Sequence, residues 1–420
     1  MVAILGYSRE QIFEAVKAMY TSVAEAPNAP FHFPTGESAC RVLGYPGEEI
    51  GQMPEALRAS FAGVGYPFRA EAVQAGDTVL DLGAGAGNDS VVASRRVGPE
   101  GHVVALDLTA AMTRKLKTAA RADGLANVSV VQGSAEQIPL ADGSVDSITS
   151  NGMLNLVPDK RRAVREMFRV LRPGGRLQIA DVVIDRPVTV DCEADPRLWV
   201  ECVVGATVEE DFLAMFRDAG FEDIEVLRSF DYFAHSPSRQ TQEIAASFGA
   251  RSIEVGMRRG ARAPSRAWQA AQRLNPQRAV ASMWRRGAMG MANLTLALVA
   301  CYGTLAAVSL LPLLGIGLAL NEALWAGTIA LFVVLAALAV AAGVKRASTP
   351  GPALLAAGGA GVVLYALFVE YSMAVEAAGF ALLAGAAVWD IAARRRRQKQ
   401  VLGLIGTTRA PGPPLPRTGG

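Results

Sequence analysis

An acid followed by three alternating glycines is the segment of this sequence whose residue types and spacing best suit chemistry. Val79–Leu82 is an apolar run that contains Asp81 and leads into a Gly-x-Gly-x-Gly turn formed by Gly83, Gly85 and Gly87. Glycines in such a turn let the backbone approach a ligand that a Cβ atom would exclude. The spacing differs from the Gly-x-Gly-x-x-Gly of dinucleotide-binding enzymes, which disfavours a nicotinamide cofactor. We therefore expect a ligand site where this strand ends.

Other polar residues follow the next predicted strands in the same way. Asp107 ends the second strand about 20 residues after the glycine turn, where a carboxylate can accept hydrogen bonds from a ribose diol. Ala135 and Glu136 follow the third strand, and Asn151 follows the fourth. Because ligands of open parallel sheets bind at the carboxyl ends of the strands, these residues should share one edge of the sheet.

The elements that must position these residues alternate between strand and helix from Asp77 to about Arg258. This alternation predicts an α/β fold with a parallel sheet and helices on both faces. Residues 1–75 read as a helical section, with Ser8 as N-cap and Gln11 three positions later. The strand candidates are Thr78–Leu82, Val103–Asp107, Val128–Gln132, Val145–Ser150, Arg176–Ala180, and an antiparallel pair at Ile224–Leu227 and Ser252–Met257.

The glycine turn, the preceding acid and the ordered set of strand ends resemble class I S-adenosylmethionine (SAM) methyltransferases. The resemblance implies a Rossmann-like methyltransferase domain over residues 76–260 with SAM as its cofactor. It also implies that Asn151 opens the methyl-transfer pocket. The cofactor-binding residues that it implies are Asp81, Gly83, Gly85, Gly87, Asp107, Ala135 and Glu136.

Several longer segments narrow this resemblance to arsenite methyltransferases, over roughly Phe61 to Met257. They are Ser150–Lys160, Arg169–Gly175, Ala180–Val182, Leu198–Ala206 and Asp231–Ser236. The resemblance implies an enzyme that transfers methyl to arsenite or thiol-bound arsenic, with a thiol reductant as a further partner.

Cysteines matter for such an acceptor because trivalent arsenic is soft and thiophilic. Cys202 stands at a matching family position, and the resemblance gives it a catalytic and arsenic-binding role. Cys192, nearby in sequence, is the candidate second metal ligand in place of the missing family cysteines, and Cys40 is a further alternative. Val64 stands where a family cysteine is expected, and Gly152 replaces another. The alternative for Cys202 is a small buried core residue.

Composition and charge argue against several other classes of function. The formal net charge of +2 argues against nucleic-acid binding, and the three histidines do not cluster as in a zinc site. The four cysteines are scattered, which suits a reducing compartment, and no signal peptide is evident at the start. Arg251 to Arg286 holds nine arginines against one acid. Residues 261–291 therefore read as a basic linker, either a solvated tether or an amphipathic helix on anionic lipid.

Four apolar segments follow the linker, each near the roughly 20 residues that span a bilayer. They predict an all-α bundle of four transmembrane helices over residues 292–392, followed by a basic and then Pro/Gly-rich tail, 393–420. Lysines and arginines flank both ends and the middle turn, so the positive-inside rule predicts a multi-pass inner-membrane protein with its methyltransferase domain and C-terminus in the cytoplasm. The segments are Leu294–Leu320, Ala323–Val344, Ala353–Val369 and Met373–Ile391.

The membrane section is similar to the small four-helix mercury-uptake (MerC-type) proteins, on the segments Leu364–Tyr371 and Val388–Asp390. Those proteins pass metal through paired thiols, whereas Cys301 is alone in the first span. Glu370, Glu376 and Asp390 lie near span ends, where we expect them to face lipid headgroups. By analogy with mercury-uptake proteins, the fusion of a methyltransferase domain to such a membrane section suggests a role in arsenic detoxification.

Two further functions stay open. The same enzyme could methylate a quinone or lipid brought close by the membrane anchor. Alternatively, the chain could be a metal-uptake membrane protein whose SAM domain is regulatory.

Overall fold

The computed structural model describes residues 8–188, 203–265, 288–303, 322–344 and 349–407, with a few isolated positions between 268 and 283. The chain divides into two compact units. One consists of Met1–Gln272 with Gly403–Gly420, and the other of Arg273–Leu402. Most of the basic linker lies outside the described residues. Each unit is taken by itself below.

The first unit is built on an eight-stranded sheet with the order β3-β2-β1-β4-β5-β8-β7, and β6 pairs with β5. Neighbours from β3 to β5 are parallel, whereas β8 runs antiparallel to both β5 and β7. The strands are β1 (Thr78–Leu82), β2 (His102–Asp107), β3 (Val128–Gln132), β4 (Val145–Asn151), β5 (Leu171–Ile184), β6 (Thr207–Val208), β7 (Phe221–Phe230) and β8 (Arg251–Arg259). The predicted parallel sheet and its antiparallel pair are confirmed.

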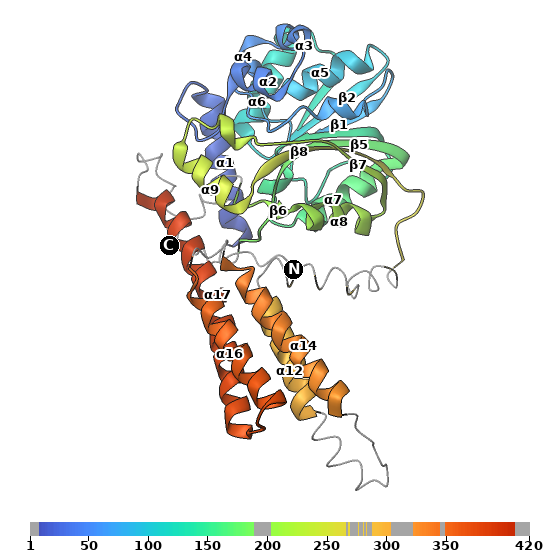
Figure 1. Cartoon of the computed structure of the whole chain (residues 1–420). Coiled ribbons are helices and arrows are strands. Elements are labelled where there is room, and N and C mark those ends of the chain that lie inside the picture. Colours follow the sequence, from blue (N-terminus) through green and yellow to red (C-terminus); the bar gives the residue numbers. More distant parts are fainter. Residues whose placement is uncertain are drawn as a thin grey trace, which may run out of the picture. The chain divides into compact units, whose positions relative to one another are not determined.

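Helices cover both faces of this sheet, with α5 and α6 on one side and α7 and α8 on the other (Figure 1). The strands are apolar because they are covered on both faces, and Leu80, Leu106, Ile148 and Ile179 are almost wholly buried. The helices after β1 are α5 (Asn88–Val97), α6 (Ala110–Ala122), η2 (Leu154–Leu156), α7 (Lys160–Val170), α8 (Glu209–Ala219), η4 (Phe233–His235) and α9 (Arg239–Phe248).

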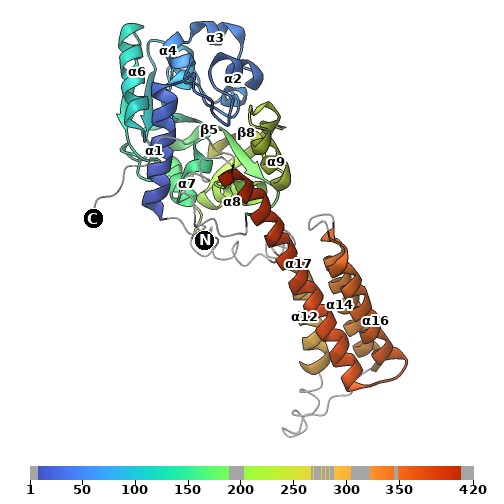
Figure 2. The ribbon, with the colours of Figure 1, turned by 90° about the vertical axis from the view of Figure 1, so that its left-hand side faces the viewer.

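The section before β1 is helical, as the sequence predicts. The capping box at the start of α1 is confirmed, since Ser8 and Gln11 each accept a hydrogen bond from the other's backbone N–H. Helix α1 lies beside α6 (Figure 2), where the side chain of Lys115 donates to the backbone oxygen of Ala24. The helices of this section are α1 (Arg9–Glu25), α2 (Gly36–Leu43), α3 (Gly47–Gln52), α4 (Glu55–Arg58) and η1 (Pro67–Ala70).

The second unit is a helical bundle. It contains α12 (Met289–Leu298), which continues as a π-helix η5 (Val299–Gly303), then α14 (Glu322–Ala341), α16 (Gly351–Phe368) and α17 (Met373–Thr407). Gly351–Phe368 and Met373–Arg397 are long and apolar enough to cross a membrane, while Met289–Tyr302 and Trp325–Ala341 are shorter apolar helices. Residues 304–321, part of the first predicted span, lie outside the described residues.

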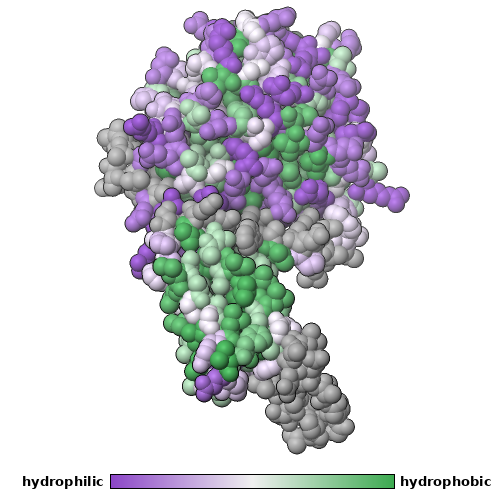
Figure 3. Space-filling view, viewed as in Figure 1, coloured by the Kyte–Doolittle hydropathy of each residue, from purple (hydrophilic) through white to green (hydrophobic). Residues whose placement is uncertain are grey.

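The surface of these helices is strongly apolar (Figure 3). Large apolar side chains that a soluble bundle would turn inward are exposed, including Leu338, Leu354, Phe368, Val388 and Trp389. Small residues let α16 and α17 approach closely, since a Cβ atom at Gly359 would lie 3.0 Å from the backbone oxygen of Gly379. Both features suit helices packed together in lipid.

Of the three acids expected to face lipid headgroups, Glu370 is exposed, but the expectation is wrong for Glu376 and Asp390. Both are buried in the bundle, at 0% and 2% exposure. Asp390 is paired with Arg394 one helical turn later, at 2.5 Å. Glu376 contacts the thiol of Cys301. Their position near helix ends did not reveal this, because the neighbouring helices cover the ends as well as the middle of the bundle.

Candidate functional site

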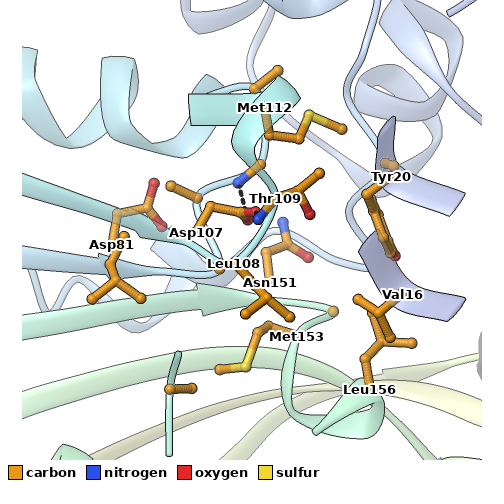
Figure 4. Close-up of a pocket in the computed structure, with 18 of the residues that line it drawn as sticks. Val16, Tyr20, Asp81, Asp107, Leu108, Thr109, Met112, Asn151, Met153 and Leu156 are labelled. Carbon is orange, nitrogen blue, oxygen red and sulfur yellow. Dashed lines mark hydrogen bonds between the residues drawn. The ribbon is translucent and has the colours of Figure 1, made fainter. Parts of the chain in front are cut away.

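A pocket of about 950 Å³, partly open to solvent, lies where β1, β2 and β4 end. One end is formed by the glycine turn and by Asp81 and Asp107, and the other includes Val16 and Tyr20 of α1 with Leu156 (Figure 4). The pocket is thus polar where the strands end and more apolar under α1.

The three glycines of the turn all have positive φ, between 53° and 97°, but they differ in what surrounds them. A Cβ atom at Gly87 would lie 2.2 Å from Cδ1 of Leu116, and one at Gly83 would lie 2.5 Å from Cβ of Met153. Nothing lies within 4 Å of the Cβ position at Gly85. Gly83 and Gly85 line the pocket, whereas Gly87 is not among the lining residues and lets α5 start close to α6. Gly85 is therefore the glycine that leaves room for a ligand.

Asp107 is held at the end of β2 by backbone donors. The backbone N–H of Gly85 donates to its Oδ2 at 2.9 Å, and that of Thr109 donates to its Oδ1 at 2.7 Å (Figure 4 shows Asp107 beside Thr109). Burial raises the pKa of Asp107, and these two donors oppose the rise. The carboxylate thus fixes the glycine turn and still lines the pocket, with acceptor capacity left for hydroxyl donors.

Asp81 lies deeper in the same wall. Its carboxylate is 2% exposed and accepts a hydrogen bond from Oγ of Ser90 at 2.5 Å. Burial, followed by the charge of Asp89, raises the pKa of Asp81 well above its ordinary value.

Asn151 is at the centre of a hydrogen-bond network. Its Oδ1 accepts from the backbone N–H of Val64 at 2.8 Å and of Gly65 at 3.2 Å. Its two Nδ2 hydrogens are shared among three acceptors: Oδ2 of Asp89 at 3.0 Å, the backbone oxygen of Gly65 at 2.9 Å and the hydroxyl of Tyr45 at 3.0 Å. Asn151 therefore ties the segment around Val64 to the pocket wall, which is a positioning contribution.

Asp89 is a pocket residue that sequence reasoning missed. Oη of Tyr45 donates to its Oδ1 at 2.5 Å. Burial raises the pKa of Asp89 to about 6, against the opposing hydrogen bonds from Tyr45 and Asn151. An available signal was its place as the second residue of the helix that the glycine turn opens, where carboxylates are favoured.

Asn88, the first residue of α5, carries an unpaired polar atom at the pocket. Its Nδ2 donates to the backbone oxygen of Leu57 at 3.0 Å, but its buried Oδ1 has no hydrogen-bond partner among the described residues. A buried amide oxygen without a donor costs about 1–3 kcal/mol, so a ligand donor at this point would stabilise the site.

Ala135 lines the pocket and Glu136 does not. The Glu136 carboxylate is fully buried on the other side of the loop, where it accepts from the backbone N–H of Asp159 at 2.8 Å and pairs with Arg9 of α1. Glu136 therefore links α1 to the segment that leads into α7. Sequence spacing could not reveal which way this side chain turns.

The predicted metal ligands Cys192 and Cys202 lie outside the described residues. No cysteine is among the described residues that line the pocket, and those residues hold no group of three His, Cys, Asp or Glu side chains that could bind a metal. Cys40 is buried in α2, and burial raises the pKa of its thiol to about 12, which makes it a poor thiolate. Val64 and Gly152 face each other, since a Cβ atom at Gly152 would lie 3.1 Å from Cγ1 of Val64.

The residues present fit SAM. SAM is a cationic ligand that carries a ribose and an amino acid. The pocket offers it the open backbone at Gly85, the carboxylate of Asp107 at the end of β2, and the unpaired amide oxygen of Asn88. Which of these residues contacts which part of the cofactor belongs to the proposal below.

Comparisons with known proteins agree with this geometry. Residues 74–220 match the family model "Methyltransferase domain", and residues 288–392 match "MerC mercury resistance protein". An arsenite methyltransferase of Halobacterium salinarum is 38% identical over 192 residues, which is 46% of this chain and 49% of that protein. A demethylmenaquinone methyltransferase of Listeria welshimeri is 38% identical over 109 residues, 26% of this chain and 46% of that protein.

Among solved structures, an arsenic(III) S-adenosylmethionine methyltransferase from Chlamydomonas reinhardtii is 31% identical, with a TM-score of 0.40. The match covers 54% of this chain and 74% of that one. The chain spans about half the length of the curated arsenite methyltransferases it matches. It combines a SAM-dependent methyltransferase domain with a C-terminal MerC domain.

Proposed function

We propose that this chain transfers the methyl group of SAM to arsenite, or to a related thiophilic acceptor, at the pocket where β1, β2 and β4 end. The observation that carries the proposal is the 38% identity to an arsenite methyltransferase over 192 residues. The fused MerC domain is consistent with a role in detoxification by analogy only.

The cofactor site would use the turn and the strand ends. SAM, when bound, supplies a methyl group on a positively charged sulfur. We propose that Asp107 accepts from the ribose hydroxyls, that Gly85 leaves room for the amino-acid part, and that Gly83 lets the backbone turn beside Met153. Oδ1 of Asn88 would accept a hydrogen bond from the ammonium group, and Ala135 would contact the adenine ring. Asp81, Gly87 and Glu136 would support these groups through the contacts described above.

The acceptor site would depend on thiolates. We propose that Cys202, with Cys192, holds the arsenic atom so that its lone pair faces the methyl group. Asn151 would fix the segment around Val64 that closes this side of the pocket. A small-molecule thiol reductant would return the product to the trivalent state for release.

A second candidate, a quinone-like or lipid acceptor, is favoured by one specific observation. Val64 and Gly152, at two positions where the family resemblance expects cysteines, form an apolar contact and supply no thiol. The identity to a demethylmenaquinone methyltransferase over 109 residues points the same way. Asp89, whose pKa burial raises to about 6, would then be positioned to take a proton from a hydroxyl acceptor.

We further propose the domain arrangement of a membrane-tethered enzyme. Residues 1–75 would be a helical section that covers the pocket, 76–260 the methyltransferase domain, 261–291 a basic linker, 292–392 four transmembrane helices and 393–420 a tail. The Arg- and Lys-rich flanks support a multi-pass arrangement in the inner membrane with both ends in the cytoplasm.

Methyl transfer from labelled SAM tests the two acceptors directly. The full-length chain in detergent should convert arsenite, in the presence of a thiol reductant, to methylated arsenic, and Cys202→Ser should abolish this product. The same preparation offered a quinol acceptor provides the comparison. Absence of methylated arsenic with wild-type protein that binds SAM would refute the arsenite proposal, and methylation of the quinol would support the second candidate.

A further inference from the structure

Three carboxylates line the pocket at the ends of β1 and β2 and the start of α5. Asp81 and Asp107 come from the paired strands β1 and β2 (Figure 4), and Asp89 comes from the first turn of α5. Asp81 and Asp89 are only 2% and 6% exposed. No lysine, arginine or histidine is among the described residues that line this pocket. Because like charges in a buried site repel one another, a positively charged ligand would stabilise the ionised forms of these acids.

Asp89 is the acid of this group whose charge state is most easily changed. Burial raises its pKa to about 6, while the hydrogen bonds from Tyr45 and Asn151 oppose the rise. The charge of Glu49 also raises this pKa, and Arg96 lowers it, although Arg96 is itself paired with Glu49 at 2.6 Å. The titratable and charged groups that interact with Asp89 are Cys40, Tyr45, Glu49, Tyr66, Asp81 and Arg96.

The residue before Asp89 provides a second, independent sign of a positively charged ligand. Asn88 lines the pocket and is 3% exposed, and its Oδ1 has no hydrogen-bond partner among the described residues. A buried amide oxygen of this kind is completed by a ligand that donates, and a charged donor forms a stronger hydrogen bond than a neutral one. Two consecutive side chains at the start of α5 therefore favour a cation.

We propose that Asp89 makes this pocket hold SAM more tightly than its demethylated product. The two ligands share the adenine, the ribose and the amino acid, and they differ by a methyl group and one positive charge on sulfur. An attraction between that charge and Asp89 is present for one ligand and absent for the other, so it contributes directly to the difference in affinity. This preference rests on the proposed function in one respect, the binding of SAM in this pocket, and is the same for either acceptor.

The charge of Asp89 then changes during the reaction cycle. When SAM binds, those Asp89 carboxyl groups that carry a proton release it to solvent, because the positive charge favours the carboxylate. In the transfer step the acceptor's lone pair forms the new bond to the methyl carbon, and the electron pair of the broken carbon–sulfur bond stays on sulfur. The positive charge thus leaves with the methyl group. Asp89 regains its higher pKa, takes up a proton from solvent and no longer attracts the product, which favours product release.

Isothermal calorimetry of the full-length chain in detergent, with SAM and with its demethylated product, tests this preference. The affinity for SAM should rise by about tenfold from about pH 5 to about pH 8, because a change of one pKa unit on binding corresponds to a tenfold change in affinity. The affinity for the product should change much less. Titrations in buffers of different ionisation enthalpy, at about pH 6, should show proton release with SAM and none with the product.

Variants of Asp89 and of its hydrogen-bond donor separate charge from structure. Asp89→Asn keeps an oxygen that can accept from Tyr45 but removes the charge, so the ratio of SAM affinity to product affinity should fall about tenfold. Asp89→Glu keeps the charge and should retain most of this ratio. Asp142→Asn changes an exposed acid that is not among the described lining residues, and this matched control should keep the parent ratio.

Tyr45→Phe is a second test that does not depend on the folding of Asp89→Asn. It removes a donor that stabilises the ionised carboxylate, so the rise of SAM affinity should move to higher pH. An unchanged affinity ratio in Asp89→Asn, or an equal pH dependence for the two ligands in the parent chain, overturns the preference and leaves SAM as the cofactor. A folded parent chain that binds neither ligand overturns the cofactor site as well.

Discussion

The two units of this molecule treat buried carboxylates differently. In the α/β unit, Asp81, Asp89, Asp107 and Asp181 are each buried or line a pocket, and each accepts hydrogen bonds from protein donors. In the described part of the helical bundle, the buried acids contact side chains: Asp390 pairs with Arg394, and Glu376 accepts from the thiol of Cys301. Backbone N–H groups help to hold the acids of the α/β unit, whereas the two acids of the bundle depend on side-chain partners.

The difference follows from the backbone. The ends of parallel strands and the starts of helices expose N–H groups, and those of Gly85, Thr109 and Leu154 donate to aspartates. Within a continuous helix, the N–H groups are already used in the helix itself. A carboxylate in a helical bundle therefore depends on side chains or on a bound ion.

The largest expected effect is on the turn that presents these backbone donors. Gly87→Ala should lower the free energy of unfolding by about 3–5 kcal/mol, because a side chain at φ +97° is strained and would overlap Leu116. Gly85→Ala, with open space around its Cβ position, should cost only about 1–2 kcal/mol in stability but weaken SAM binding. Denaturant unfolding and SAM calorimetry measure the two quantities. Equal stability losses in both variants would contradict the separate roles of the two glycines.

The second-largest effect is expected from removing the side-chain amide of Asn151, which links Val64, Gly65 and Asp89 by hydrogen bonds. Asn151→Ala leaves the N–H groups of Val64 and Gly65 and one oxygen of Asp89 without this partner. We expect a loss of about 2–3 kcal/mol in stability, with lower activity at saturating SAM. Thr118→Ala, on the exposed face of α6, is the control and should leave both unchanged. An Asn151→Ala protein with full stability would show that the network is not needed to hold the wall.

A smaller effect is expected from Asp107→Asn. The variant keeps an oxygen for one backbone donor but loses the charge that accepts from a ribose diol, so SAM should bind about 10–100-fold more weakly. Isothermal calorimetry with SAM and with its demethylated product measures the change. Unchanged affinity for both ligands would remove Asp107 from the cofactor site.

The smallest effect concerns pH. The pKa of Asp89 is raised to about 6 from 3.8, so the folded chain holds this proton more tightly than the unfolded chain. The stabilisation from Asp89 is therefore present below pH 3.8 and is lost as the pH rises through about 6. Asp89→Asn should make the fall of unfolding free energy across this window shallower, though not flat, because the pKa of Asp181 is also raised to about 6. An unchanged slope would contradict the assignment.

Local sequence signals were sufficient to predict the backbone elements around the pocket. Strand ends, glycines and Asp107 could be predicted because apolar runs and turn residues act over a few neighbours. Contacts that depend on tertiary packing could not be predicted, such as the entry of Val16 and Tyr20 of α1 into the pocket wall. The turning of Glu136 toward Arg9 and the burial of Glu376 against Cys301 are of the same kind, since each depends on a partner far away in sequence.

The geometry at Val64 and Gly152 makes the cost of introducing a thiol different at the two positions. Gly152 has φ +73°, and a side chain there would press on the valine methyl groups. A smaller residue at position 64 would relieve that contact but not the backbone strain, so a cysteine at position 152 would still cost stability. We therefore expect this chain to tolerate Val64→Cys better than Gly152→Cys.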